Sequence, residues 1–192
     1  MGNTFEPDLV FNGVIVPFSA HGDASDCNLN KGRRIKLVQE FIGLDIPKLH
    51  TLDIGPPNAF GQLLGLSDNS IGDVNEGVKA PSVDYDLIVF SEIIEHLMNV
   101  LGPLRDCYRL LKPGGVLVVS TPIPNIIFYQ SLHHLAEYRP DRLVQVFEYV
   151  GFKVEKYQKI NIWDKRFAFY GVRPLLRVLF HRSQLWKLRK PL

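Results

Sequence analysis

Cysteine is scarce in this sequence, since Cys27 and Cys107 are the two cysteines among 192 residues. They lie too far apart to form the paired spacing of a zinc-binding motif, and two cysteines in a chain of this size give no disulfide framework. So few cysteines are typical of proteins from a reducing compartment. We therefore expect a cytoplasmic protein whose fold depends on its hydrophobic core.

Long apolar runs are also lacking. No stretch approaches the roughly 20 consecutive apolar residues that a membrane-spanning helix requires. Residues 1–17 have neither the basic start nor the apolar stretch of a signal peptide. A composition that is 46% hydrophobic and 22% charged excludes a disordered chain, and a length of 192 residues fits one domain with a sizeable core.

Acidic residues are rare near the C-terminal end. Residues 151–192 contain 11 lysines and arginines against Glu155 and Asp164, whereas residues 1–150 contain 11 basic and 18 acidic residues. The net charge of +2 therefore hides a basic end on an acidic body. Such an end favours an anionic partner, which could be a lipid headgroup, a nucleic acid or a phosphorylated metabolite. A solvated basic rim without a partner is the alternative.

Helix-like and strand-like patterns alternate from residue 30 onward, after an irregular N-terminal segment, 1–29. Apolar residues at helical spacing predict helices that begin near Asn30, Leu101 and Leu143 and end at Gly43, Pro113 and Gly151. Short apolar runs predict strands at 50–55, 85–90, 116–120 and 152–158. This alternation is typical of an α/β fold in which helices cover both faces of a parallel sheet.

Three segments carry a specific pattern: Leu52-Asp-Ile-Gly55, Tyr85-Asp-Leu-Ile-Val-Phe-Ser-Glu-Ile-Ile-Glu-His-Leu97 and Leu110-Leu-Lys-Pro-Gly-Gly-Val-Leu-Val-Val-Ser-Thr-Pro122. Their order and content resemble the class I S-adenosylmethionine-dependent methyltransferases, most closely small type 11-like methyltransferase-domain proteins. The resemblance implies a Rossmann-like, doubly wound, mostly parallel sheet with an antiparallel last strand at 185–188. It also implies a single domain over 30–192, with a basic amphipathic insertion at 160–182.

The resemblance further implies S-adenosylmethionine as cofactor and methyl transfer to an unidentified small-molecule or lipid-linked acceptor. It places eight residues beside the cofactor: Asp53, Ile54, Gly55, Pro56, Asp73, Val74, Ser91 and Glu92. Ligands of open α/β sheets bind beyond the carboxyl ends of the strands, and glycine at position 55 permits a tight turn there. Asp53 either bonds the cofactor or the loop amides, or braces the turn as a structural carboxylate.

The glycine segment departs from the family pattern. Where the family has Gly-x-Gly-x-Gly, this chain reads Gly55-Pro-Pro-Asn-Ala59, in which Pro57 has no amide donor and Ala59 adds a side chain. A methyltransferase-like fold that serves as a binding or scaffold module, without catalysis, is therefore the alternative to an enzyme. The missing glycines also disfavour a nicotinamide-dependent oxidoreductase.

The stretch between the first two segments is short. Only 29 residues separate Gly55 from Asp84, where the family fits two strands and two helices. We therefore expect one strand–helix pair to be missing or reduced to turns, and one strand fewer than the family's seven. With the remaining strand placed near 66–71, Asp73 follows it as the expected ribose partner, because a carboxylate can accept from both ribose hydroxyls. Asp68 is the reserve candidate.

Histidines follow two of the predicted strands. For His96, a buried imidazole bonded to backbone and a catalytic role are both open. His133 and His134 follow the third strand, where similar proteins have a histidine-containing loop over the active site. Either residue could act as general base on an alcohol or amine acceptor, and a polar lid is the alternative. We expect no metal, because His133 and Glu137 supply two ligands and a catalytic zinc site needs three.

Residues 173–182 are short, apolar and basic. A helix there has a basic stripe and an apolar stripe, formed by Arg173, Arg177 and His181 and by Leu175, Leu176 and Leu179. Such a helix either packs Leu176 and Leu179 on the core or lies on an anionic membrane surface. The expected partners are thus a small-molecule or lipid-linked substrate and, peripherally, an anionic membrane. We expect no nucleic acid and predict no oligomeric state.

Overall fold

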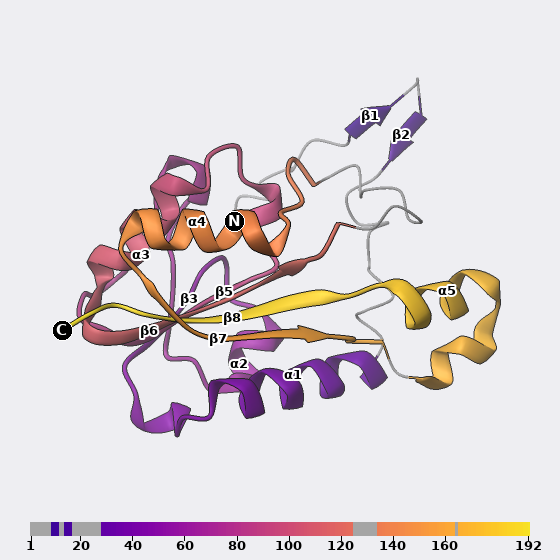
Figure 1. The fold of residues 1–192 in the computed structure, drawn as a ribbon, viewed down its shortest axis with the longest axis horizontal. Coiled ribbons are helices and arrows are strands. Elements are labelled where there is room, and N and C mark those ends of the chain that lie inside the picture. Colours follow the sequence, from indigo (N-terminus) through magenta and orange to yellow (C-terminus); the bar gives the residue numbers. More distant parts are fainter. Residues whose placement is uncertain (1–8, 12–13, 17–27, 125–133, 164) are drawn as a thin grey trace, which may run out of the picture.

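The structure, a computed structural model, describes residues 9–11, 14–16, 28–124, 134–163 and 165–192. A six-stranded sheet lies at the centre, in the order β4-β3-β5-β6-β8-β7 (Figure 1). Its strands are β3 (Thr51–Asp53), β4 (Asp68–Asn69), β5 (Tyr85–Ser91), β6 (Leu111–Pro122), β7 (Lys153–Ile160) and β8 (Ser183–Arg189). Strand β8 runs antiparallel to both neighbours, and the other neighbouring pairs are parallel. The predicted mostly parallel sheet with an antiparallel last strand is confirmed.

Helices cover both faces of this sheet (Figure 1). One face carries α1 (Asn28–Ile42) and α2 (Ala59–Leu64), and the other carries α3 (Leu101–Leu110) and α4 (Pro140–Val150). A fifth helix, α5 (Val172–Phe180), lies at one end of the sheet. Short 3-10 turns lie between these elements: η3 (Ile46–Lys48), η4 (Val74–Glu76), η5 (Ile94–His96) and η6 (Lys165–Tyr170).

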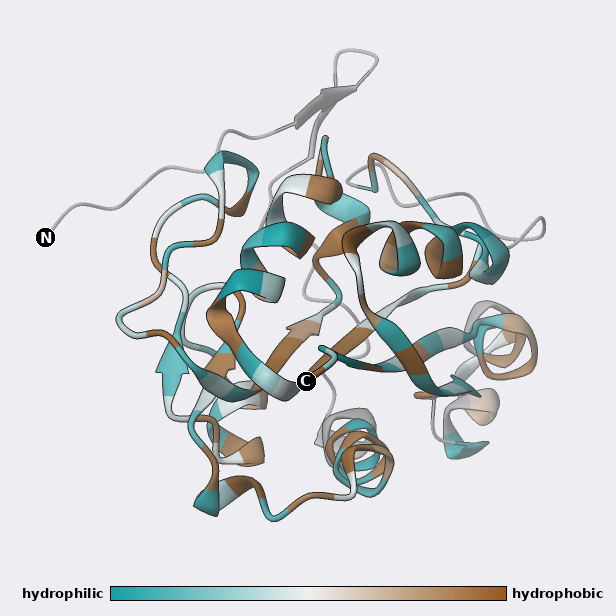
Figure 2. Cartoon of the chain, turned by 60° about the vertical axis from the view of Figure 1, so that its left-hand side comes forward, coloured by the Kyte–Doolittle hydropathy of each residue, from teal (hydrophilic) through white to brown (hydrophobic). Residues whose placement is uncertain are grey.

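The core is split by the sheet into two layers, because successive strand residues point to opposite faces. Along β6, Val116 and Val118 pack against the α1 and α2 side. Leu117 and Val119 pack against the α3 and α4 side. Figure 2 shows hydrophobic residues along the central strands and on the sides of the helices that face them. This alternation continues to the carboxyl end of β6, where polar residues replace the apolar ones.

The region between β4 and β5 confirms the predicted deletion. This stretch, which the structure describes in full, contains η4 and an isolated bridge between Ile71 and Lys79. The sheet accordingly has six strands. Strand β4 itself is only two residues long and falls within the predicted range, 66–71.

The N-terminal part differs from the prediction of an irregular segment. Strands β1 (Leu9–Phe11) and β2 (Val14–Val16) pair antiparallel, as their β-branched and aromatic residues favour. Helix α1 begins at Asn28, two residues before the predicted cap at Asn30. It ends as predicted at Gly43, which adopts a positive φ of 61°.

Helix α5 contacts the core differently from the prediction. Among its described side chains, Val178 packs against the core, whereas Leu179 is 49% exposed and Leu176 only half-buried. Of the two alternatives for this helix, packing on the core is contradicted for Leu179, because the helix meets the end of the sheet rather than its face (Figure 1). No helix in the described part of the chain has both the length and the apolar character needed to cross a membrane.

Candidate functional site

A cavity of about 440 Å³ opens at the carboxyl ends of β3 and β5. Its volume is within the range of small-molecule sites. The cavity is lined from α1, the β3–α2 turn, α2 and the end of β5 by Arg34, Ile35, Asp53, Ile54, Gly55, Pro56, Asn58, Ala59, Phe60, Leu63, Ser91, Glu92 and Ile93. It therefore lies at the edge of the sheet where open α/β folds bind their ligands.

The turn after β3 depends on glycine at position 55. Gly55 has a φ of 114°, which favours glycine, and a side chain there would meet the Ile93 side chain at 3.3 Å. The Gly55 amide donates a hydrogen bond of 2.7 Å to the Ser70 hydroxyl. This hydrogen bond fixes the backbone of the turn, and Gly55 itself lines the cavity.

The Asp53 side chain holds the turn and the start of α2 together through Asn58. Its carboxylate accepts a 2.9 Å hydrogen bond from the Asn58 amide, and Asn58 in turn caps α2 by accepting from the Gly61 amide at 3.0 Å. A Cβ on Gly61 would lie 2.3 Å from the Asp53 carboxylate, so only glycine lets α2 approach so closely. Burial raises the pKa of Asp53 to about 6, against the lowering effects of Asn58 and Arg34. These contacts match the structural-carboxylate alternative for Asp53.

A chain of polar side chains crosses the end of β5 and β6. Arg34 donates to the Ser91 hydroxyl at 2.7 Å, and Ser91 lies 2.8 Å from the Ser120 hydroxyl. Ser120 donates to the Glu92 carboxylate at 2.8 Å, and Arg34 forms an ion pair of 3.8 Å with that carboxylate. Phe60 lies 4.8 Å below the Arg34 guanidinium. The cavity therefore combines an apolar wall with a paired cation and anion.

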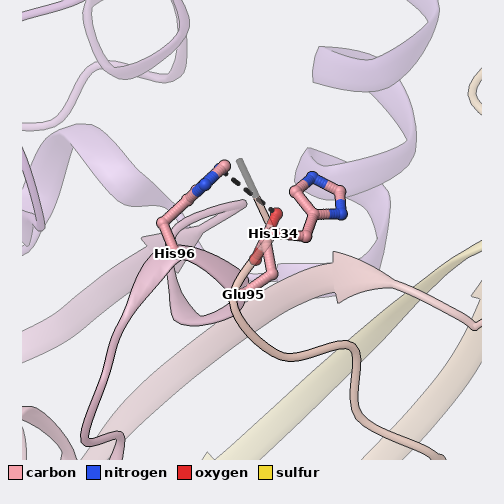
Figure 3. A group of neighbouring side chains, drawn as sticks. All are labelled: Glu95, His96 and His134. Carbon is pink, nitrogen blue, oxygen red and sulfur yellow. Dashed lines mark ion pairs between the residues drawn. The ribbon is translucent and has the colours of Figure 1, made fainter. Parts of the chain in front are cut away.

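A second polar cluster lies on the other side of β6. Thr121, the neighbour of Ser120, donates to the Glu95 carboxylate at 2.9 Å. Glu95 is 1% exposed, and burial together with the Glu92 charge raises its pKa to about 8. His96 and His134 lie beside it, with ring centroids 5.1 Å apart (Figure 3). His96 is 42% exposed and Glu95 is the buried member of the Glu-His pair, so the buried-imidazole alternative for His96 was wrong.

Six of the eight residues predicted to bind the cofactor line the cavity: Asp53, Ile54, Gly55, Pro56, Ser91 and Glu92. The other two lie outside its lining. Asp73 caps η4 by accepting from the Asn75 amide at 2.9 Å, and Val74 is buried against the α3 side of the core. Their contact with a cofactor remains a prediction.

The other candidates lie elsewhere. Asp68 accepts a 2.8 Å hydrogen bond from the Tyr85 hydroxyl and pairs with His50, away from the cavity lining. His134 lies 2.8 Å from Glu137 and does not line the cavity. His133 lies outside the described residues.

The residues that line the cavity without having been predicted include Arg34, Asn58 and Phe60. Arg34 lies on a helix whose apolar spacing indicated core packing alone, Phe60 lies on α2, a helix that the sequence pattern did not predict, and Asn58 stood only in the Pro-Pro-Asn turn. A usable signal existed for Asn58, because asparagine directly before an apolar stretch is a common helix N-cap. No local pattern could show that Arg34, 57 residues before Ser91, reaches its hydroxyl.

Comparison with known proteins finds relatives among methyltransferases. A protein named "Probable S-adenosylmethionine-dependent methyltransferase" in Mycolicibacterium smegmatis is 34% identical over 82 residues, covering 39% of this chain and 31% of that protein. The ubiquinone biosynthesis O-methyltransferase of Vibrio cholerae is 28% identical over 86 residues, covering 45% and 31%. The chain thus spans about a third of the length of these two curated relatives.

The fold and the family agree as well. The crystal structure of an S-adenosylmethionine-dependent methyltransferase from Archaeoglobus fulgidus superposes with a TM-score of 0.58 at 18% identity, covering 83% of this chain and 94% of that one. A family model described as a methyltransferase domain matches residues 35–166, which is more than half of the sequence. On this match, with the fold and the glycine turn as predicted, the chain belongs to the methyltransferase-domain family.

Proposed function

We propose that this protein is an enzyme that binds S-adenosylmethionine in the cavity at the carboxyl edge of its sheet and transfers the methyl group to a small-molecule or lipid-linked acceptor. The observation that carries the proposal is the Gly55 turn facing the Arg34, Ser91 and Glu92 chain across one cavity. Relatives named as ubiquinone biosynthesis O-methyltransferases support a hydroxyl oxygen as the atom that receives the methyl group.

The residues present fit the cofactor. The backbone of Gly55 permits close approach of its amino-acid part, and the Ser91 hydroxyl and Glu92 carboxylate offer hydrogen-bond acceptors. Phe60 and Ile93 supply the apolar wall that a purine ring requires. When bound, the cofactor supplies an activated methyl group, so the chain's own contribution is to hold the two reactants in line and exclude water.

Titration calorimetry with S-adenosylmethionine and S-adenosylhomocysteine tests the proposal. We expect micromolar binding to the full chain. Ala59→Trp places a large ring in the cavity lining from an exposed position, so binding should be lost while folding is kept. Gln62→Trp is the matched control, because it lies exposed on the same helix outside the lining and should bind normally.

The noncatalytic alternative gives the opposite result. Pro57 lacks the amide donor that the family's second glycine provides, and Ala59 adds a side chain at the cavity. If neither ligand releases heat nor shifts the melting temperature at millimolar concentration, the enzyme proposal fails. The chain is then a binding or scaffold module built on the methyltransferase fold.

We also propose a cytoplasmic location with peripheral contact to an anionic membrane, through the surface formed by η6 and α5. This surface exposes large apolar side chains beside basic ones: Phe169 is 90% exposed, Tyr170 73% and Val172 74%. Lys165, Arg166, Arg177 and Arg182 belong to the same segment. Each basic residue near an anionic surface contributes about 1 kcal/mol, an attraction that fades within a Debye length.

Vesicle sedimentation tests this contact. We expect binding to vesicles rich in phosphatidylserine at low salt, a steep loss toward physiological salt, and no binding to phosphatidylcholine vesicles. The double change Phe169→Ser and Val172→Ser should weaken it. Met98→Ser is the control, because Met98 is 86% exposed outside this surface. Equal binding by both variants, or no binding at low salt, would exclude the membrane contact.

A further inference from the structure

The second polar cluster gathers two imidazoles and one carboxylate at a single point. One ligand atom each from Glu95, His96 and His134 lies within 4.8 Å of the others. Within the cluster, Glu95 Oε1 and His96 Nε2 lie 4.0 Å apart. Figure 3 shows the three side chains turned toward one another, from η5 and from the segment before α4.

The surrounding residues hold this cluster in position. Thr121 donates to Glu95 Oε2 at 2.9 Å, which leaves Oε1 directed at His96. Glu137 lies 2.8 Å from Nδ1 of His134, which orients the ring and leaves Nε2 for another partner. A carboxylate on the far nitrogen of a histidine is the common second contact of metal-ligating histidines.

The two segments are also joined through the backbone. The amides of Leu135 and Ala136 both donate to the carbonyl of Glu95, at 2.7 and 3.1 Å. His134 is therefore carried to Glu95 by main-chain hydrogen bonds and does not depend on its side chain alone. The juxtaposition of residues nearly 40 positions apart is a fixed part of the fold.

We propose that Glu95, His96 and His134 bind one divalent transition-metal ion, with zinc preferred. Two imidazoles and a carboxylate are the ligand set of many catalytic zinc sites, in which a fourth position stays open. Imidazole also suits zinc, copper, iron and nickel, whereas magnesium prefers oxygen ligands alone. Zinc ligands at 2.0–2.1 Å lie roughly 3.3 Å apart, so the two histidines must turn slightly inward to close around the ion.

The site is separate from the cofactor cavity. Thr121 and Glu95 lie on the α3 and α4 side of the sheet, while the cavity lies on the α1 and α2 side. A zinc ion on His134 Nε2 would exclude that nitrogen as a general base. The two roles of His134 are therefore mutually exclusive and can be told apart by metal binding alone.

Calorimetry on the metal-stripped full chain tests the proposal, with zinc chloride, cobalt chloride and magnesium chloride as probes. We expect one zinc ion per chain, visible absorption of tetrahedral cobalt, no heat with magnesium, and a higher melting temperature with zinc. His96→Ala and His134→Ala should abolish zinc binding. Glu137→Gln should weaken it about 10- to 100-fold, as loss of a second contact does.

The matched control is His50→Ala, because His50 has a similar exposure, 38% against 42% for His96, and lies by Asp68. Circular dichroism confirms that each variant is folded. Zinc binding that survives both His96→Ala and His134→Ala, or that is lost equally in His50→Ala, overturns the site. Survival in His134→Ala alone also overturns it and leaves that residue to the general-base role.

Discussion

The two polar clusters at the carboxyl edge of the sheet begin at neighbouring residues and differ in how their carboxylates are neutralised. Ser120 bonds Glu92 on the α1 and α2 side, where Arg34 provides a permanent cation at 3.8 Å. Thr121 bonds Glu95 on the other side, where the nearest basic groups are histidines. An internally paired carboxylate suits a polar organic ligand, whereas a buried one beside imidazoles suits a cation. The carboxyl end of β6 can therefore contribute to two different sites, one through Ser120 and the other through Thr121.

The largest expected effect is a loss of stability where α2 packs against Asp53, on the same side of the sheet as the Glu92 cluster. Gly61→Ala places a methyl group 2.3 Å from the buried Asp53 carboxylate, so either α2 or Asp53 must move. We expect a loss of about 3 kcal/mol in the free energy of unfolding, as for overpacked cores. Urea denaturation measures it. Gly102→Ala is the control, since its added methyl meets nothing closer than 3.8 Å, and equal losses in both variants would contradict the account.

A smaller expected effect is a pH dependence of the stability, caused by Asp53. Burial raises the pKa of Asp53 from 3.8 to about 6. As the pH rises, the unfolded chain therefore loses the Asp53 proton at a lower pH than the folded chain does. The contribution of Asp53 to stability is therefore fully present below pH 4 and falls as the pH rises toward 6. Asp53→Asn should remove this fall, so the stability of the variant relative to wild type should increase by about 2 kcal/mol between pH 4 and 7. A difference that stays constant over this range would show that Asp53 titrates normally.

The smallest expected effect concerns the predicted ribose partner. Asp73 caps η4 and is exposed, outside the cavity lining, so a ribose contact requires the segment after β4 to move inward. We expect Asp73→Ala to weaken S-adenosylhomocysteine binding by about 1 kcal/mol, the value of one hydrogen bond. Asp68→Ala, which loses its bond to Tyr85, should change the affinity less. The reverse order would place the ribose at β4 itself.

The sequence predicted those parts of the fold that depend on local pattern. Apolar runs located β5 and β7, and the short distance from Gly55 to Asp84 predicted the missing strand and helix. The antiparallel strand β8 came from the family resemblance. The ribbon of β1 and β2 was missed, although Asn12-Gly13 between two apolar pieces is a recognised hairpin signal. Core packing of Leu179 on α5, one of the two alternatives, was wrong, because spacing shows which residues share a face but not what that face meets.

The candidate site was predicted only for residues that belong to a continuous sequence motif. Gly55, Ser91 and Glu92 belong to motifs, and all three line the cavity. The cluster of Glu95, His96 and His134 could not be predicted, because two segments must first be brought together by the sheet and by the hydrogen bonds to the Glu95 carbonyl. Within residues 133–137 the sequence offered two metal ligands, one fewer than a catalytic zinc site needs, so no metal was predicted.

A crossed titration tests most directly whether the edge holds two separate sites. Arg34→Met and His134→Ala are each titrated with S-adenosylhomocysteine and with zinc, next to wild type. We predict that Arg34→Met weakens S-adenosylhomocysteine binding about tenfold, because the charged hydrogen bond that positions Ser91 at the cavity is lost. Zinc binding should be unchanged. His134→Ala should lose zinc and keep S-adenosylhomocysteine. If either folded variant loses both ligands, or if each ligand ignores its own variant, the division of the edge between Ser120 and Thr121 is contradicted.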